Sequence, residues 1–317
     1  MSKIRFGVIG CGYIAKKAFL PAIKKSKTAE LIAIASRDLK KSKLEAKNNN
    51  CDFENSYRSL LKRNDIDAVY ISTIPSTHEE IIILAADYGK HILCEKPLST
   101  SFSSAKKIIK YCEKKNIGIF EGFMYQFHNQ HSKINKLVDK GEIGEPILFT
   151  ASFGFPLKEE NNYRYRKDLG GGSCLDAGCY TIHAARHFFK KEPTKIYSII
   201  NKKNNEVDIH GSVLMDFGDN KTAQLSFGFN NFYRNTYSIW GTKGYIVSSR
   251  AFSIPPNEKA KIIINKQDFQ DEIICESDDN FLSQINYFCA GIDDSNKYLY
   301  WRDEIIKQAI TVDKVLS

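Results

Sequence analysis

The sequence lacks long apolar runs and an export signal. None of its apolar stretches approaches the roughly 18 or more residues of a membrane span, and Met1 leads directly into the strand-like Ile4–Ile9 without the small-residue cleavage site of a signal peptide. We therefore expect a cytoplasmic protein with no membrane partner. The 317 residues, 42% of them apolar, suffice to bury a sizeable core in two domains.

The eight cysteines show no regular spacing. They are scattered through apolar segments and form no CxxC pair, and the chain is far longer than a small disulfide-stapled domain. We expect them to be reduced and mostly buried thiols.

Positive charge is not concentrated in one segment. The net charge is +9, but the lysines are dispersed along predicted exposed helix faces, without interleaved aromatic residues. Such a surface is more typical of solvation than of nucleic-acid binding, so we expect no nucleic-acid partner. It is compatible with attraction of phosphate-bearing small molecules.

Short strands alternate with helices in the first part of the chain, which is typical of a doubly wound parallel sheet. The predicted strands are Ile4–Ile9, Leu31–Ser36, Ala68–Thr73, His91–Glu95 and Gly118–Gly122, and the predicted helices lie near Ile14–Ser26, Leu39–Asn48, His78–Tyr88 and Ser103–Lys115.

From about Pro146 the pattern changes to longer alternating segments separated by turn residues, which predicts a mostly antiparallel sheet. These segments are Ile196–Asn201, Ser212–Phe217, Thr222–Phe229, Thr236–Trp240, Tyr245–Ser249, Lys261–Asn265 and Glu272–Glu276, and Asp279–Leu316 is predicted to be helical. The predicted fold class is α/β plus α+β: a Rossmann domain in residues 1–122 and an open antiparallel sheet in residues 123–317. We expect the second domain to serve substrate binding and oligomerisation, with a C-terminal helix that could pack back on the first.

Gly10-Cys11-Gly12-Tyr13-Ile14-Ala15 forms a G-x-G-x-x-A motif directly after the first predicted strand. The first glycine permits a tight turn, the second lets a pyrophosphate approach the backbone, and Ala15 allows close packing of helix on strand. The phosphates would lie at the helix N-terminus. Strand, motif, helix and second strand in this order favour a dinucleotide site over an ordinary glycine turn, with Gly10, Gly12, Tyr13 and Ile14 in contact with the cofactor.

Ser36-Arg37-Asp38 ends the second predicted strand, where an NAD-preferring enzyme usually carries an acidic residue. The guanidinium of Arg37 and the hydroxyl of Ser36 suit a 2′-phosphate, so we expect NADP(H) to be preferred, with NAD(H) possible. Asp38 is interpreted as a helix N-cap. The alternative, contact with the adenosine ribose of NAD, stays open.

A predicted helix carries Asp176, Tyr180, His183 and His187 in one narrow stripe, taking 100° per residue. The rest of its circumference is apolar. An exposed amphipathic helix would normally show Lys or Glu on its wet face, so this stripe indicates the wall of a cleft. For His187 a solvated position is the alternative.

His183 and His187 are also spaced as metal ligands could be. No HExxH motif accompanies them, and hydride transfer from a nicotinamide needs no metal. Cys174 and Cys179 are interpreted as packing residues. We therefore expect no metal site.

With these motifs, the sequence resembles the Gfo/Idh/MocA oxidoreductase family over essentially the whole chain. Besides the glycine turn, the markers are Thr73-Ile74-Pro75 with His78, Glu95-Lys96-Pro97, the run Glu121–His128 (EGFMYQFH), Asn162-Tyr163-Arg164, Gly170-Gly171-Gly172 and Asp176–Tyr180. The resemblance implies cofactor contacts at Thr73, Ile74, Pro75, His78, Glu95 and Lys96. It also implies an unusual peptide geometry at Pro97, which aims Lys96 at nicotinamide and substrate. Gln126 departs from the family, where many members have arginine.

With Tyr180, the sequence resembles the tyrosine-type members of the family, which include glucose–fructose oxidoreductase, dihydrodiol dehydrogenase and some nucleotide-sugar 3-ketoreductases. Hydride addition to a carbonyl leaves an alkoxide that must be protonated. We predict Tyr180 as the acid, with Lys96 lowering its pKa and stabilising the oxyanion and Asp176 orienting the pair.

The predicted substrate contacts are Tyr125, Tyr163, Arg164 and His183. Aromatic and basic residues suit a polyhydroxylated, phosphate-bearing ligand, and a nucleotide-sugar ketone is the first specific hypothesis. Oxidation of a free sugar or a dihydrodiol is the alternative within enzymes, and dinucleotide sensing without turnover is the alternative outside them. The open sheet face is expected to pair subunits into a homodimer or homotetramer.

Overall fold

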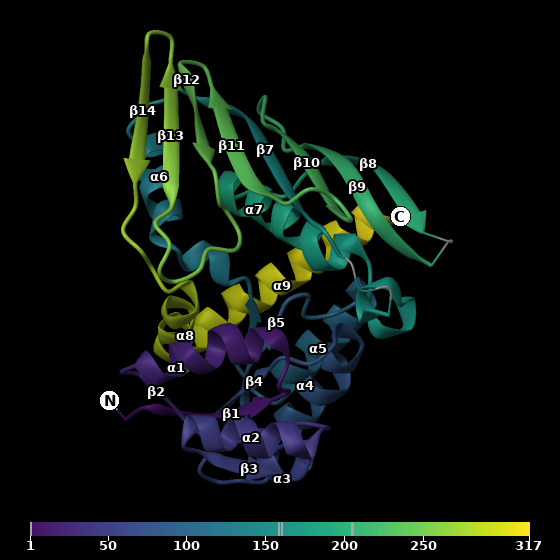
Figure 1. The fold of residues 1–317 in the computed structure, drawn as a ribbon. Coiled ribbons are helices and arrows are strands. Elements are labelled where there is room, and N and C mark those ends of the chain that lie inside the picture. The colour runs from purple at the N-terminus through teal and green to yellow at the C-terminus, as the bar shows by residue number, and fades with distance from the viewer. Residues whose placement is uncertain (1, 158, 160, 204–205) are drawn as a thin grey trace. The chain divides into compact units, whose positions relative to one another are not determined.

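The computed structural model describes residues 2–157, 159, 161–203 and 206–317. They divide into two compact units, one of residues up to Met124 with Phe281–Ala309, the other of Tyr125–Asn280 with Ile310–Ser317 (Figure 1). The predicted fold class, a Rossmann sheet plus a mostly antiparallel sheet, is confirmed. The division of cofactor and substrate binding between the domains stays a prediction. In the part of the chain that is described, no helix is long and apolar enough to cross a membrane.

The described strands of the first unit form a six-stranded parallel sheet in the order β3-β2-β1-β4-β5-β6. They are β1 (Ile4–Ile9), β2 (Ala29–Ala35), β3 (Asp52–Glu54), β4 (Ala68–Ile71), β5 (His91–Glu95) and β6 (Ile119–Gly122). The strand order reverses at β1, which pairs with both β2 and β4. Open α/β sheets bind ligands at the carboxyl ends of the strands at such a reversal. All five predicted strands are present, and β3, too short to show a pattern, was missed.

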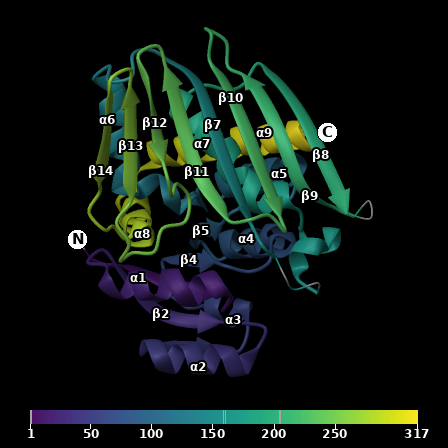
Figure 2. The ribbon, with the colours of Figure 1, turned by 45° about the horizontal axis from the view of Figure 1, so that its top comes forward.

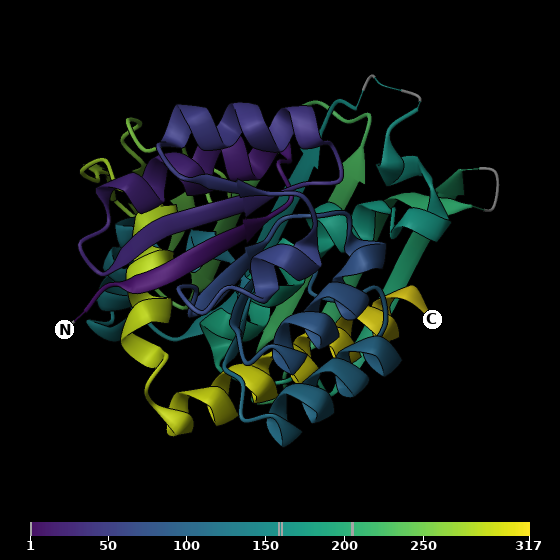
Figure 3. The same cartoon turned by 90° about the horizontal axis from the view of Figure 1, so that it is seen from below.

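Helices cover both faces of this sheet (Figure 3). They are α1 (Leu20–Lys25), which continues a π-helical turn at Ala15–Phe19, α2 (Leu39–Asn49), α3 (Tyr57–Leu61), α4 (His78–Asp87), α5 (Phe102–Lys114), α8 (Asn280–Gly291) and α9 (Ser295–Leu316). On one face Ile82 and Ile108 belong to the same apolar core as Ile305. On the other, the ring of Phe6 lies 5.9 Å from that of Phe19 and 5.8 Å from that of Phe288. Burial on both faces explains the continuous apolar strands.

The described strands of the second unit form an eight-stranded sheet in the order β14-β13-β12-β11-β7-β10-β9-β8 (Figure 2). They are β7 (Pro146–Phe155), β8 (Lys195–Lys203), β9 (Val207–Asp216), β10 (Thr222–Phe229), β11 (Arg234–Gly241), β12 (Gly244–Ser248), β13 (Lys261–Lys266) and β14 (Phe269–Ile274). The pairing of β7 with β10 is parallel, and the other described pairs are antiparallel. All seven predicted strands are present, β10 with the predicted ends and the other six with shifted ends, while β7 was not assigned.

Helix α7 (Cys179–Phe189) lies on one face of this sheet and follows a second π-helical turn, Cys174–Gly178. Phe149 of β7 packs on it, with its ring 5.5 Å from that of Phe188. Another helix of this unit, α6 (Asn129–Asp139), was not predicted. Its buried side carries Gln130 and His131 beside Ile134, so polar residues occupy part of the face whose apolar pattern normally indicates a helix.

Candidate active site

The turn after β1 requires glycine at two positions. Gly10 has φ of +98°, and a Cβ atom there would lie 2.7 Å from the carbonyl oxygen of Ser72. A Cβ on Gly12 would lie 3.2 Å from the same oxygen. The backbone after β4 therefore approaches this turn closely. The next residues, Tyr13 and Ile14, are exposed, Tyr13 to 72%, so their side chains are accessible to a ligand at the turn.

Ser72 tests whether this turn fits a dinucleotide. Its Oγ is buried and has no hydrogen-bond partner in the described part of the chain, and it lies 3.7 Å from the position of a Cβ on Gly12. Buried hydroxyls normally have a partner, which a phosphate or ribose oxygen at the glycine turn would supply. The residues present fit the cofactor. Sequence reasoning missed Ser72, although a small polar residue directly after a buried strand was a usable signal.

The end of β2 provides the predicted selectivity residues. The carboxylate of Asp38 accepts a hydrogen bond of 3.1 Å from the backbone N–H of Lys41 and so caps α2. Its interpretation as an N-cap is confirmed. Ser36 Oγ accepts a 3.3 Å hydrogen bond from the N–H of Asp38, and Arg37 is exposed. A cationic side chain is thus accessible at this strand end, while the neighbouring carboxylate is engaged with the helix.

The segments after β4 and β5 hold the other predicted cofactor residues. Thr73 and Ile74 are half-buried and Pro75 is buried. Glu95 is buried and accepts a hydrogen bond of 2.6 Å from the hydroxyl of Tyr70. Lys96 comes next and is half-buried.

The unusual geometry expected at Pro97 is present, because the Lys96–Pro97 peptide is cis. His78, the first residue of α4, is fully buried. Its ring nitrogens lie against the backbone oxygens of Pro97 and Thr73. The predicted cofactor residues of the first unit thus gather at, or just beyond, the carboxyl ends of β1, β2, β4 and β5.

In the second unit the predicted polar stripe is packed among side chains. Tyr180 and His183 of α7 are only 5% and 6% exposed. The ring of Tyr180 lies 5.3 Å from that of Phe153, 5.8 Å from that of Phe252 and 5.9 Å from that of Tyr125. These three rings, from segments far apart in the sequence, orient the phenol. Phe153 and Phe252 were missed by sequence reasoning, since nothing local distinguishes them from other core aromatics.

Tyr125 and His183 contact each other directly. The hydroxyl of Tyr125 lies 2.7 Å from Nδ1 of His183, and the ring of His187 stacks beside His183 at 5.6 Å. Burial raises the pKa of Tyr125 well above its ordinary value and lowers the pKa of His183 well below its own. Both groups are therefore neutral at neutral pH, and the hydrogen bond between them carries no charge.

Asp176, in the π-helical turn before α7, pairs with Arg164. Arg164 Nε donates to its carboxylate at 2.5 Å, and the guanidinium lies 4.8 Å from the centre of the Tyr163 ring. The backbone N–H of Gly172 donates to the carbonyl of Arg164 at 2.9 Å, and a Cβ on Gly171 would lie 2.5 Å from that same oxygen. The glycine run thus holds the Arg164 segment against the start of α7. The structure connects three predicted residues, Tyr163, Arg164 and Asp176.

Asp208 of β9 fixes the start of the same turn and was missed by sequence reasoning. It is buried and accepts hydrogen bonds from Ser173 Oγ at 2.7 Å and from the N–H of Cys174 at 2.5 Å. A carboxylate here satisfies the first N–H group of the helical segment, that of Cys174, and complements its dipole. No sequence signal links it to a helix 34 residues away.

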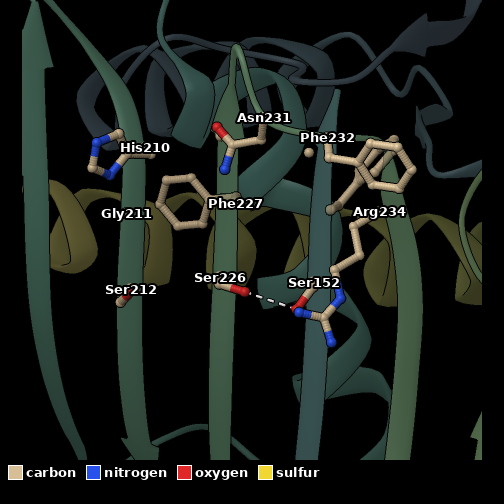
Figure 4. A pocket seen from close by; sticks show the side chains of 12 residues that line it. Ser152, His210, Gly211, Ser212, Ser226, Phe227, Asn231, Phe232 and Arg234 are labelled. Atoms are coloured by element: carbon tan, nitrogen blue, oxygen red, sulfur yellow. Dashed lines mark hydrogen bonds between the residues drawn. The ribbon is translucent and has the colours of Figure 1, made fainter. Parts of the chain in front are cut away.

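A shallow hollow of about 180 Å³ lies on the sheet of the second unit (Figure 4). Ser152, Ser212, Ser226, His210 and Arg234 are among the residues that line it, and Ser152 and Ser226 are hydrogen-bonded at 2.8 Å. None of the predicted site residues is among them. In the residues described, no group of three or more His, Cys, Asp or Glu side chains could hold a metal ion.

The fold, the residues at the strand ends of the first unit and the residues around Tyr180 in the second define an oxidoreductase with a dinucleotide-binding Rossmann unit. Residues 4–123 match the model of the GFO/IDH/MocA oxidoreductase family with its NAD-binding Rossmann fold, and residues 131–247 match the C-terminal domain of that family. The chain belongs to the GFO/IDH/MocA family, as the resemblance predicted.

Individual relatives cover three quarters of the chain or more. A dTDP-3,4-didehydro-2,6-dideoxy-alpha-D-glucose 3-reductase of Saccharopolyspora spinosa is 35% identical over 98% of this chain and 96% of its own. A trans-1,2-dihydrobenzene-1,2-diol dehydrogenase of Xenopus tropicalis is 31% identical over 76% and 72%. The crystal structure of KijD10, a 3-ketoreductase from Actinomadura kijaniata in complex with NADP and TDP-benzene, has a TM-score of 0.94 at 32% identity over 99% and 97%.

Two further structures of KijD10 carry a substituted lysine and a substituted tyrosine. Those two positions are separated by as many residues as Lys96 and Tyr180 are here.

Proposed function

We propose that this enzyme reduces a keto group of a nucleotide-linked sugar with NADPH. The observation that carries the proposal is the pair Lys96 and Tyr180. Lys96 directly follows the carboxyl end of β5, and Tyr180, on α7, is oriented by three aromatic rings from other segments. Support comes from the relatives named as nucleotide-sugar 3-reductases. The lysine and the tyrosine that are substituted in KijD10 are spaced as Lys96 and Tyr180 are here, which supports a catalytic role for both residues.

The proposed chemistry follows the charge that develops on the substrate. Bound NADPH would supply a hydride to the carbonyl carbon. The carbonyl oxygen then becomes an alkoxide, which the ammonium of Lys96 stabilises electrostatically. The Tyr180 hydroxyl gives this oxygen its proton, and the ammonium of Lys96 makes that transfer easier by favouring the phenolate. The overall change is ketone, NADPH and one proton to alcohol and NADP⁺.

The cofactor preference rests on the end of β2. Because Asp38 is engaged as the cap of α2 and Arg37 is exposed, we propose that Arg37 and Ser36 bind the 2′-phosphate. The proposed dinucleotide contacts are those predicted from the sequence, with Ser72 added for its buried, unpartnered hydroxyl. His78 differs from the other proposed cofactor contacts, because both of its ring nitrogens lie against backbone oxygens of the protein.

Tyr125, Tyr163, Arg164 and His183 remain the proposed substrate residues. Arg164 and Tyr163 are half-buried, with the guanidinium fixed by Asp176, and they suit a phosphate-bearing, ring-containing ligand. Tyr125 and His183 are deeply buried and joined to each other, so we propose that they act beside the Tyr180 ring. Asp176 orients Arg164 in this scheme.

The test is a paired substrate screen of the purified enzyme. NADPH consumption is followed with TDP-linked 3-keto sugars, and NADP⁺ reduction is followed with free sugars and dihydrodiols. We expect the highest kcat/KM with the keto-sugar nucleotides, and none for Lys96→Ala. Faster oxidation of a free sugar or a dihydrodiol would replace the proposed substrate class, and turnover by Lys96→Ala would contradict the proposed role of Lys96.

We further propose a homo-oligomer that pairs through the sheet face opposite α7. Tyr197, Ile199 and Leu214 on β8 and β9, and Trp240 and Tyr245 on β11 and β12, are exposed, Trp240 to 61%. The register from β8 through β9, β10, β7 and β11 to β12 places them on this one face. Exposed apolar patches of this kind mark association surfaces. A monomeric mass by light scattering at micromolar concentration would contradict the proposal.

We propose that the protein is cytoplasmic, because a reducing compartment suits its free cysteines. All eight are thiols in the structure, and six of them are buried. Burial raises the pKa of Cys94 and Cys174 well above the ordinary thiol value. These thiols are therefore protonated and unreactive, as in proteins that carry no disulfides.

A further inference from the structure

Buried polar groups hold the turn that carries Lys96. Glu95, before it, accepts a hydrogen bond from Tyr70 of β4 at 2.6 Å. After it, the backbone N–H of Leu98 donates to Glu121 of β6 at 2.8 Å. Between these two contacts lies the carbonyl oxygen of Pro97, 3.0 Å from Nδ1 of His78 on α4.

His78 connects the ends of two adjacent strands. Its Nε2 lies 3.1 Å from the carbonyl oxygen of Thr73, beyond β4, and its Nδ1 faces Pro97, beyond β5. The side chain is fully buried, so it is shielded from solvent, and its two ring nitrogens lie within hydrogen-bond distance of these oxygens. Thr73 is only five positions before His78 in the chain, and the helical turn Pro75–Thr77 between them already keeps the two residues close. Pro97 belongs to a different strand, and the imidazole joins it to α4.

The state of the imidazole decides which carbonyl is held. Burial, with the charge of Lys96 among the further causes, lowers the pKa of His78. The ring is therefore neutral at neutral pH and carries one N–H, while both of its partners are carbonyl oxygens that can only accept. It donates to Pro97 or to Thr73, and only the first of these bonds fixes the residue next to Lys96.

We infer that His78 is a positioning residue for Lys96, donating from Nδ1 to the carbonyl oxygen of Pro97. This inference rests on the proposed catalytic role of Lys96. It gives His78 a task distinct from cofactor contact: the ring holds the backbone that aims the ammonium. A shift of about 1 Å in a catalytic group can cost about 100-fold in rate, so loss of this bond is expected to appear in kcat.

Two nearly isosteric variants separate the two hydrogen bonds. The amide nitrogen of His78→Asn can take the place of Nδ1 and keep the bond to Pro97, whereas that of His78→Gln can take the place of Nε2 and keep the bond to Thr73. We expect kcat to fall about 100-fold in His78→Gln and less than about 10-fold in His78→Asn, with the dissociation constant of NADPH similar in both. Equal kcat values in the two variants, at any level, overturn the inference.

A second readout needs no turnover. In cofactor-free protein, the rate at which an amine-acetylating reagent modifies Lys96, followed by mass spectrometry with the other lysines as reference, is expected to change in His78→Gln and to stay parental in His78→Asn. His91→Phe is the matched control, because His91 lies at the opposite end of β5, where it accepts a hydrogen bond from Gly118. It is expected to lower the melting temperature while leaving kcat and Lys96 acetylation parental.

The variant Lys96→Met distinguishes failure of the proposed function from failure of the positioning role of His78. An active Lys96→Met variant overturns the proposed function. An inactive one, together with equal kcat values for His78→Asn and His78→Gln, overturns the positioning role alone.

Discussion

Arg37 shows how a single exposed side chain can select a cofactor. It is exposed and follows β2, beside an aspartate whose carboxylate accepts a hydrogen bond from Lys41 at the start of α2. We expect NADPH to bind more tightly than NADH, and Arg37→Ala to narrow the difference by about 1.5–3 kcal/mol, the scale of a hydrogen bond to a charged group. Fluorescence titration with both nucleotides measures this, with exposed Lys40→Ala as control. Equal affinities in the parent enzyme would contradict it.

Tyr180 allows the chemistry to be separated from packing, because phenylalanine keeps the ring among Tyr125, Phe153 and Phe252. Tyr180→Phe should bind NADPH normally and lose about 10²–10⁴-fold in kcat, the usual effect of removing a general acid. Lys96→Met should be at least as damaging. The parental pH profile should show a group titrating well below a free tyrosine, and this limb should vanish in Tyr180→Phe.

Tyr197→Phe, on exposed β8, is the control for loss of a tyrosine hydroxyl. If Tyr180→Phe kept a near-parental kcat and the same pH limb, the acid would have to be another group. His183 is the next candidate, because it lies on the same helix.

At the scale of elements, the start of α7 depends on a strand distant in sequence. Asp208 of β9 is buried and accepts hydrogen bonds from Ser173 and Cys174. Asp208→Ala should lower the free energy of unfolding by about 1–3 kcal/mol, because it leaves buried donors without a partner. Urea unfolding measures the loss, and exposed Asp271→Ala should change it by less than about 0.5 kcal/mol. A similar small change for both variants would show that the cap contributes nothing.

Elements whose signal is local were predictable from the sequence. The glycine turn after β1 and the ends of β5 and β10 follow from residue types within a few positions. Of the stripe predicted as a cleft wall, Tyr180 and His183 are buried, while Asp176 and His187 are half-buried. Tyr125 and Phe252 cover it from distant segments, and the π-helical turn Cys174–Gly178 breaks the assumed 100° per residue.

Contacts between distant segments were not predictable, because sequence signals are local. His78 reaches Pro97 across 19 residues, and Leu98 reaches Glu121 across 23. His78, Pro97 and Glu121 belong to motifs, but a motif states which residue types occur together and not which atoms meet. The hydrogen-bonded turn around Lys96 exists only once the parallel strands have been placed side by side.

For the whole molecule, buried histidines make folding sensitive to acid. Burial lowers the pKa of His131 to about 3, and its ring nitrogens contact Tyr237 and Ala251. Below about pH 6.5 the unfolded chain binds a proton at this residue that the folded chain does not, so stability falls with pH until about pH 3. The pKa values of His128, His183 and His187 are also lowered by burial, which adds to the effect.

The prediction is a urea midpoint that decreases steadily between pH 6.5 and 5, above the range in which most carboxylates titrate. His131→Gln should be less stable than the parent at pH 7.5, but its midpoint should decrease less steeply with acid. Parallel pH dependences for parent and variant would show that His131 does not contribute.

The central position of β7 has a consequence for synthesis of the chain. It is the first strand of its sheet to be made, yet its neighbours are β10 and β11, which begin only at Thr222 and Arg234. A ribosome that adds about 5–20 residues per second needs roughly 3–13 s to reach β10. Throughout that time both edges of β7 are unpaired, and Phe149 and Phe153 have no sheet to join. The nascent chain therefore carries an unpaired central strand while the segment between β7 and β10 is being translated, which is when a chaperone would protect it.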